Sequence, residues 1–312
     1  MNSRPSTAKL SSRTILRRRL AIEPKMLSWG CNMSLELPEI KILEEQMGKV
    51  LQGKRIKSYK LQDYEKLQKI GFMNRDLKAF AQLVGRRIES VVSRGNTILV
   101  KLSDATNLIL GPEYGGEIRY HNKGKTPQAK FHLMIEFADD TALTVRLTSM
   151  GGIYVMKDDE LPRSYFYKRD FNPDVASPID KSFTLEDFST SLSKNKKALK
   201  SVLVGKDALL VGISNSSFQD ILYRAKLHPK RKASELNAEE RRRLYEAIRY
   251  ILSERIRLNG KEQFTDLNGR QGNYTPVMGP NMKGTKCAVC KTSIQKISIG
   301  GGTVFLCPKC QV

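Results

Sequence analysis

The stretch CAVCKTSIQKISIGGGTVFLCPKC, residues 287–310, carries a pair of cysteines at each end. Cys287 and Cys290 form one C-x2-C pair, Cys307 and Cys310 form the other, and sixteen residues separate them. Two such pairs supply the four thiolates of a closed tetrahedral zinc site, which leaves no position open for a catalytic water. Four reduced structural thiols and a redox pair are the alternatives, but redox C-x-x-C motifs usually occur singly. We therefore predict one structural Zn2+ ion.

The segment between the cysteine pairs places apolar residues on both sides of three glycines. Ile294 and Ile297 follow the first pair, and Val304 and Phe305 precede the second. This pattern predicts a β-hairpin with residues 300–302 as its turn. So short a segment depends on its metal to fold, and a hairpin held by zinc is well suited to reach a nucleic-acid duplex.

The chain as a whole is strongly basic. Its 312 residues include 54 Lys and Arg against 32 Asp and Glu, for a net charge of +22. Such an excess favours a polyanionic partner, of which nucleic acid is the leading candidate. No apolar run of about 18 residues occurs, so no membrane partner is expected. Four of the five cysteines lie in the last 26 residues, which is unlike a secreted disulfide framework and favours a reducing compartment.

Changes of pattern predict an α+β multidomain chain. Residues 1–33 are rich in Ser, Thr and Arg with a single acid, and are expected to be a disordered basic extension. They resemble an organellar transit peptide, or translated sequence upstream of a start at Met33. Short alternating segments in residues 34–165 predict a β-sandwich. Helical periodicity in residues 183–264 predicts a helical domain, followed by a zinc finger over residues 281–312.

The expected elements follow from apolar spacing and from Gly, Pro and Asn breaks. The predicted helices cover residues 38–52, 185–192, 196–204, 216–225 and 238–259. The predicted strands cover residues 88–92, 97–102, 107–110, 117–120, 131–137, 142–147 and 152–156. Three prolines in residues 157–182 predict a linker. Ser234 is a plausible start signal for the last helix.

Three further strings carry a family resemblance. Residues 35–40, LELPEI, look like the signature P-E-L-P-E-V. Residues 212–215, GISN, are similar to the G-I-G-N of a helix-two-turn-helix, and residues 266–274 to D-x-x-G-x-x-G-x-F. With the cysteine pairs, the chain resembles the formamidopyrimidine glycosylase and endonuclease VIII family over about residues 35–311, and within it a divergent bacterial branch that begins L-E-L-P-E. The resemblance implies an N-terminal β-sandwich, a helix-two-turn-helix domain and a zinc-finger β-hairpin.

The resemblance also implies a catalytic site near the start of the sandwich. In the family a free N-terminal proline amine attacks the sugar C1′ and a neighbouring glutamate moves protons. Leu35 stands in the proline's place, while Glu36 keeps the acid-base position and Glu39 the second carboxylate. If Met33 starts translation and is removed, the α-amine of Ser34 could form the same Schiff base with Glu36 as acid-base. Alternatively the two carboxylates only stabilise a helix start, which is the favoured interpretation for Glu39.

Several family positions hold other residues here. Asn96 stands where the family has a lysine, and Gly302 stands where the finger has an arginine. The loop that carries intercalating Arg and Phe in the family has the sequence SMGG at residues 149–152. These departures favour loss of part of the family's chemistry.

Four residues are assigned to DNA contact. Lys200 matches a family lysine and either binds a phosphate or is merely solvated. Asn215 either caps a helix or contacts a phosphate with the helix N-terminus, and the two roles are compatible. Tyr114 replaces the intercalating Met, and is either a wedge behind a flipped base or a core aromatic. Arg119 is also expected to contact DNA.

Two functions remain open from the sequence. The first is a base-excision DNA glycosylase, a hydrolase that acts on damaged double-stranded DNA, with or without abasic-site lyase activity. The second is a catalytically inactive lesion- or structure-specific DNA-binding protein on the same scaffold; an architectural DNA protein is a less specific third. We expect a monomer in the cytoplasm, at the bacterial nucleoid, with organellar targeting by residues 1–33 as the minor alternative.

Overall fold

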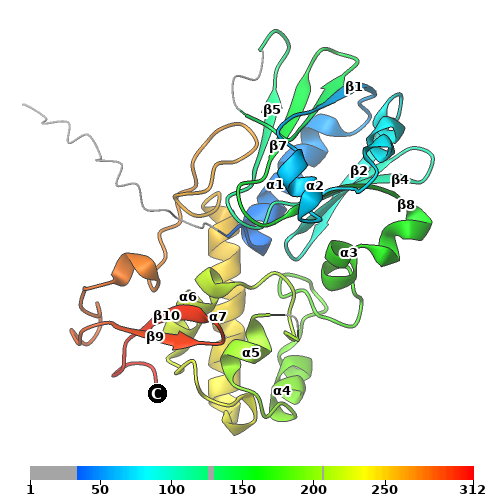
Figure 1. The fold of residues 1–312 in the computed structure, drawn as a ribbon. Coiled ribbons are helices and arrows are strands. Elements are labelled where there is room, and N and C mark those ends of the chain that lie inside the picture. The colour runs from blue at the N-terminus through cyan, green and yellow to red at the C-terminus, as the bar shows by residue number, and fades with distance from the viewer. Residues whose placement is uncertain (1–33, 126–129, 206) are drawn as a thin grey trace, which may run out of the picture. The chain divides into compact units, whose positions relative to one another are not determined.

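The computed structural model describes residues 34–125, 130–205 and 207–312 (Figure 1). The predicted disordered extension, residues 1–33, lies outside the described residues. In the described part no helix is long and apolar enough to cross a membrane.

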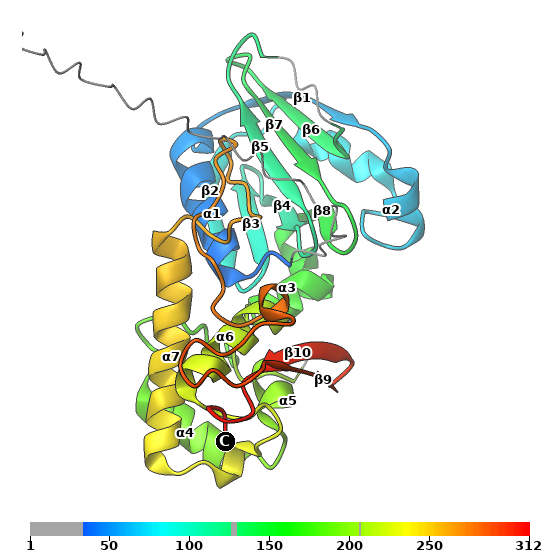
Figure 2. The same cartoon turned by 90° about the vertical axis from the view of Figure 1, so that its left-hand side faces the viewer.

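The first domain is the predicted sandwich of two antiparallel four-stranded sheets, with strand orders β1-β6-β7-β5 and β2-β3-β4-β8. The strands are β1 Ile56–Leu61, β2 Ile88–Arg94, β3 Thr97–Leu102, β4 Thr106–Gly111, β5 Glu117–His121, β6 Leu133–Phe137, β7 Ala142–Arg146 and β8 Gly152–Lys157. Alternate residues of β6 (Leu133, Ile135 and Phe137) point into the core between the sheets. Figure 2 shows α1, Leu37–Leu51, which packs against β2 and completes that core.

The sequence analysis did not predict the first strand, and it predicted a linker where the end of the sandwich domain contains helices. β1 is an edge strand whose polar residues are partly exposed, so it lacks a clean apolar alternation. Two short helices, α2 Glu65–Lys69 and the 3-10 helix Leu77–Leu83, also lie in this part. The predicted linker instead contains a 3-10 helix, Asp158–Arg163, and α3, Tyr165–Asp170. Both pack onto the sandwich, because Leu161 and Phe166 are buried against Leu99 and Ile109.

The second domain is helical. Its helices are α4 Leu185–Ser193, α5 Leu199–Leu203, α6 Asn215–Ala225 and α7 Ala238–Arg257. Helix α5 is shorter than predicted because the chain before it is extended and Leu199 N donates to Arg231 O at 2.9 Å. Helix α7 starts at a capping box of Asn237 and Glu240, and Ser234 lies in a separate 3-10 turn instead.

The zinc-finger hairpin consists of β9, Gln295–Ile299, and β10, Gly302–Leu306. Its turn has two residues, Gly300 and Gly301, with φ of 55° and 72°, the geometry that favours glycine in a tight hairpin. The prediction of a three-glycine turn was wrong, since Gly302 pairs with Ile299 in the ladder. Strand β10 lies against α6 (Figure 1).

The segment after α7 ties the helical domain to the sandwich. Tyr120 N donates to Leu267 O at 3.0 Å, and Gln46 Nε2 donates to Asp266 Oδ2 at 2.9 Å. The side chain of Phe264 is buried in the sandwich core. Helix α1 also contacts α7 directly, so the start of the sandwich lies against the helical domain.

Candidate functional site

The most densely bonded polar group at the contact between the domains is the carboxylate of Glu36, which is fully buried. Ser217 N donates to its Oε2 at 3.1 Å, so the carboxylate lies at the N-terminus of α6, where the helix dipole favours an anion. The hydroxyls of Ser214 and Ser217 also donate to it. Arg255 Nη1 lies 3.1 Å from Oε2 and Ser34 Oγ lies 3.1 Å from Oε1.

These contacts keep Glu36 ionised. Burial alone raises its pKa, but the positive charges of Arg255 and Lys261 and the hydroxyls of Ser214 and Ser217 lower the pKa to about 2. At neutral pH the group is therefore a fixed negative charge that can accept a proton but holds none to donate.

Glu39 forms the second half of a buried ion cluster. Arg255 Nη2 bonds both of its oxygens, at 2.8 and 2.7 Å, and Glu36 N donates to it at 3.1 Å. Arg255 is only 1% exposed, and these bonds join α1 to α7. The sequence analysis did not identify Arg255. The sequence feature that could have indicated its burial is its position on the apolar stripe of α7, four residues after Ile251 and three after Leu252.

Lys261 lies beside the same carboxylate and was also not identified from the sequence. It is 4% exposed, and its Nζ donates to Ser34 O at 2.8 Å and lies 3.5 Å from Ser216 Oγ. The nitrogen of Leu35, in the place of the family's proline amine, is a peptide N–H that donates to Glu113 O at 2.7 Å.

Lys200 and Asn215 form a polar link between the helical domain and the finger. Lys200 Nζ donates to Asn215 Oδ1, and Asn215 Nδ2 donates to Thr303 O at 2.7 Å. Burial lowers the pKa of Lys200 to about 8, although Glu36 raises it in part. Asn215 is the first residue of α6, and Ser214 takes the N-cap position, so the helix-cap interpretation of Asn215 was wrong.

Tyr114 lies on the edge of the sandwich that meets this site. Its backbone forms an isolated bridge with Ser34. Burial raises the pKa of its half-buried side chain, and the negative charges of Glu113 and then Glu36 raise it further. Tyr114 N donates to Met150 O at 3.1 Å. The side chain of Met150 is 49% exposed, so the SMGG loop presents an apolar tip beside Tyr114.

Arg119 and Asn96 form hydrogen bonds away from Glu36. Arg119 Nη2 bonds Glu117 Oε1 at 2.7 Å, and its Nη1 bonds Asp266 O, so it supports the segment after α7. Asn96 N donates to Asp170 Oδ2 at 3.1 Å. The structure therefore brings Ser34, Glu36, Glu39 and Tyr114 together and leaves Arg119 outside that group.

The four finger cysteines converge as the sequence predicted. All four Sγ atoms, from Cys287, Cys290, Cys307 and Cys310, lie within 4.8 Å of one another. Tyr223 Oη lies 3.2 Å from Cys287 Sγ, which links the cluster to α6. Four convergent thiols, which no further ligand group joins in the part of the chain that the structure describes, fit a closed structural zinc site.

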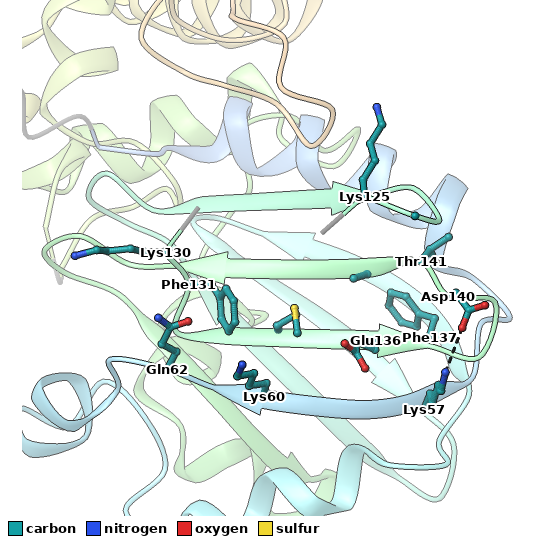
Figure 3. Close-up of a pocket in the computed structure, with 13 residues that line it drawn as sticks. Lys57, Lys60, Gln62, Lys125, Lys130, Phe131, Glu136, Phe137, Asp140 and Thr141 are labelled. Carbon is teal, nitrogen blue, oxygen red and sulfur yellow. Dashed lines mark hydrogen bonds and ion pairs between the residues drawn. The ribbon is translucent and has the colours of Figure 1, made fainter. Parts of the chain in front are cut away.

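A basic hollow lies elsewhere on the sandwich, over β1, β6 and the start of β7 (Figure 3). It has a volume of about 550 Å³, and Lys57, Lys60, Lys125 and Lys130 line it. None of the site residues predicted from the sequence borders it, and Asp140 already pairs with Lys57.

One class of base-excision DNA glycosylases combines a β-sandwich, a helix-two-turn-helix domain and a four-cysteine hairpin. The fold of this chain has these three parts, with Glu36 buried where the first two meet. Family models agree in all three parts. The formamidopyrimidine-DNA glycosylase N-terminal domain matches residues 35–157, the formamidopyrimidine-DNA glycosylase H2TH domain matches residues 175–266, and the zinc finger found in FPG and IleRS matches residues 284–312. These three matches together cover most of the chain and support membership of the formamidopyrimidine-DNA glycosylase family, as the sequence predicted, while the narrower bacterial branch stays a prediction.

The chain is similar to individual members of this family over nearly their whole length. A formamidopyrimidine-DNA glycosylase of Listeria innocua is 28% identical over 280 residues, which is 88% of this chain and 99% of the relative. One of Streptococcus pneumoniae is 29% identical, over 88% of this chain and 98% of the relative. A solved complex of Lactococcus lactis Fpg with abasic-site DNA superposes with a TM-score of 0.75 at 26% identity, over 89% of this chain and 99% of that one. The predicted fold class and the structural zinc are confirmed.

Proposed function

We propose that this chain binds duplex DNA at damaged nucleotides and acts there in base excision, as a glycosylase with abasic-site lyase activity. The observation that carries the proposal is the ionised Glu36, buried where α1 meets α6 and α7, in a chain that keeps all three parts of the family's DNA-binding architecture. A fixed anion in a buried site stabilises the positive charge that develops on the sugar when the base departs.

The phosphate backbone would be held by the basic surface and by the finger. Lys200 and Asn215 lie next to the hairpin turn, since Lys200 approaches Gly300 and Asn215 bonds Thr303. A bound phosphate would compete with Asn215 for the Lys200 amine and favour its protonated form. Tyr114 and the exposed Met150 would fill the space left by an extruded nucleotide. Arg119 would support this surface through its bond to Asp266 O.

The amine is the part of the mechanism that departs from the family. Leu35 N is an amide already engaged with Glu113 O, and an amide does not form a Schiff base. A chain that began at Ser34 would supply an α-amine next to Glu36. In the longer chain the nitrogen of Ser34 is also a peptide amide, so another amine is needed.

The proposal is tested by comparing the affinity of the 312-residue chain for a duplex with a stable abasic analogue and for the undamaged duplex. We expect at least tenfold tighter binding to the abasic duplex, because a missing base lowers the cost of extruding the nucleotide. Equal affinity for both duplexes would contradict the proposal. A protein with this function is expected to act as a monomer at the bacterial nucleoid.

Binding without catalysis is the second candidate function. One observation favours it: both oxygens of Glu36 already accept hydrogen bonds from Ser217, Ser214 and Arg255, which leaves little capacity to move protons. A chain that prefers abasic DNA but neither excises oxidised bases nor cuts abasic sites would have this function.

A further inference from the structure

We propose that Lys261 supplies the amine that forms a Schiff base with the deoxyribose of an abasic site. This inference rests on the proposed function and names the nucleophile that the sequence lacks at Leu35. It also differs from the Ser34 hypothesis, because the amine of Lys261 is present whether or not residues 1–33 are attached.

The first support is the position of the amine. Lys261 Nζ lies 2.8 Å from Ser34 O, and that oxygen and Leu35 N belong to the same peptide group. Since these two peptide atoms are roughly 2.3 Å apart, the lysine amine lies within about 5 Å of Leu35 N. That nitrogen stands where the resemblance places the attacking amine, so a side chain delivers an amine to nearly the same point.

The second support is the rigidity of the segment that carries the lysine. Lys261 N donates to Glu39 Oε1 at 3.2 Å, and its backbone forms a bridge with Tyr274. A Cβ on Gly272 would lie 2.2 Å from Lys261 O, so the backbone at Gly272 packs directly against the backbone of Lys261. A nucleophile held by a fixed backbone loses less entropy when it reaches its attacking geometry.

The third support is the charge around the amine. Lys261 is buried and acts electrostatically on Glu36. The carboxylate of Glu36 therefore lies where it can stabilise the cationic iminium that the attack produces. This negative charge is already in place before DNA binds.

The reaction balances without any added reagent except water. The amine of Lys261, in its neutral form, adds to the C1′ aldehyde of the open sugar to form a carbinolamine, which takes up one proton from solvent and loses water to give an iminium ion. Water then accepts the proton that leaves C2′, and the electron pair of that C–H bond expels the 3′ phosphate as the C3′–O bond breaks. Water hydrolyses the imine and restores the amine. Throughout, the iminium keeps one N–H, which can still donate to Ser34 O.

The test is borohydride trapping of the 312-residue chain on an abasic duplex, with peptide mass mapping of the covalent adduct. We expect the adduct on Lys261, also in a chain that starts at Ser34. Lys261→Arg, which keeps the positive charge and most of the volume, should lower trapping at least a hundredfold while affinity for the abasic duplex changes less than threefold. Lys69→Ala, on the exposed side of α2, should trap like the unchanged protein.

The outcomes separate the two proposals. An adduct on the Ser34 amine or on any other residue overturns the role of Lys261, as does full trapping by Lys261→Arg. No adduct at all, in a chain that prefers abasic DNA, overturns the role of Lys261 and leaves damage binding standing. No preference for abasic DNA overturns both. Mapping the unchanged protein does not depend on whether a variant folds.

Discussion

The zinc finger and the buried carboxylate cluster are both built from four or five polar side chains, but they are encoded differently. The finger takes its ligands from 24 consecutive residues, 287–310, with a spacing that already implies the metal. The cluster joins Glu36 and Glu39 to Ser217, Arg255 and Lys261, and its hydrogen-bonded pairs are up to 222 residues apart in sequence. A metal site can thus be local in sequence, whereas a buried ion cluster exists only after the domains have packed.

Removing one zinc ligand should have the largest effect on folding and on DNA affinity. Cys290→Ala or Cys307→Ala is expected to abolish zinc binding and unfold the finger, because structural zinc contributes on the order of 10 kcal/mol to so small a module. DNA affinity should fall at least a hundredfold, since Asn215 would lose its partner Thr303. Zinc content per chain and DNA affinity are the measurements.

Cys31 provides the matched control, because it lies outside both cysteine pairs. Cys31→Ala should keep one zinc per chain and full DNA affinity. Less than half a zinc ion per purified unchanged chain would count against the local encoding of this site.

A change in the buried carboxylate cluster should instead lower the free energy of unfolding of the whole chain. Arg255→Met is expected to cost about 3–5 kcal/mol in the free energy of unfolding, because it leaves Glu36 and Glu39 buried without their cation. Urea unfolding measures this cost, and zinc content should not change in the folded protein. Arg257→Met is the control, since that side chain is 65% exposed and forms its ion pair with Glu254. A cost no larger than that of the control would show that the cluster does not hold the domains together.

The pH dependence of stability tests the contribution of the buried cluster through Glu36. The pKa of Glu36 falls from an ordinary 4.5 to about 2 in the folded chain, so its contribution is present above pH 4.5 and is lost as the pH falls toward 2. The expected loss is roughly 3 kcal/mol. Glu36→Gln should lack this part of the acid sensitivity.

That pH comparison is made as a difference between the two proteins, so that other groups cancel. Asp220 is one of them, because burial raises its pKa to about 6 and its effect on stability has the opposite sign. Identical acid sensitivity in the unchanged protein and in Glu36→Gln would contradict the assignment of the low pKa to Glu36.

The smallest effect concerns the surface between the two regions. If about six phosphates are neutralised, log affinity for duplex DNA should fall against log salt with a slope near −5. Lys200→Ala should reduce that slope by about 1 and weaken binding several-fold. Lys69→Ala should leave the slope unchanged, and an equal reduction by both variants would remove Lys200 from the interface.

Most of the fold was predictable because its signals are local. The cysteine spacing, the helical stripe of α7 and the alternation in β6 each specify an element without its neighbours. The edge strand β1 and the helix α3 lacked such signals, since the first is partly exposed and the second follows a proline that resembled a linker residue.

The site was predictable only where the family resemblance reached it. Glu36 and Ser34 were identified in this way, but Arg255 and Lys261 were not, because only tertiary packing shows that they are buried against Glu36 and Ser34. A lysine just beyond the end of a helix, as Lys261 is beyond α7, is ordinarily expected in solvent. A charged residue on an apolar helix stripe, as at Arg255, is the one sequence signal of a buried partner.

The central claim is that damaged DNA is processed at the buried carboxylate. Single-turnover cutting of an abasic duplex by Glu36→Gln, with enzyme in excess and at matched occupancy, tests it most directly. We predict that the variant keeps DNA affinity within threefold and cuts at least a hundredfold more slowly, while Glu45→Gln, on the exposed side of α1, cuts like the unchanged protein. Equal cutting by Glu36→Gln and the unchanged protein would contradict the claim.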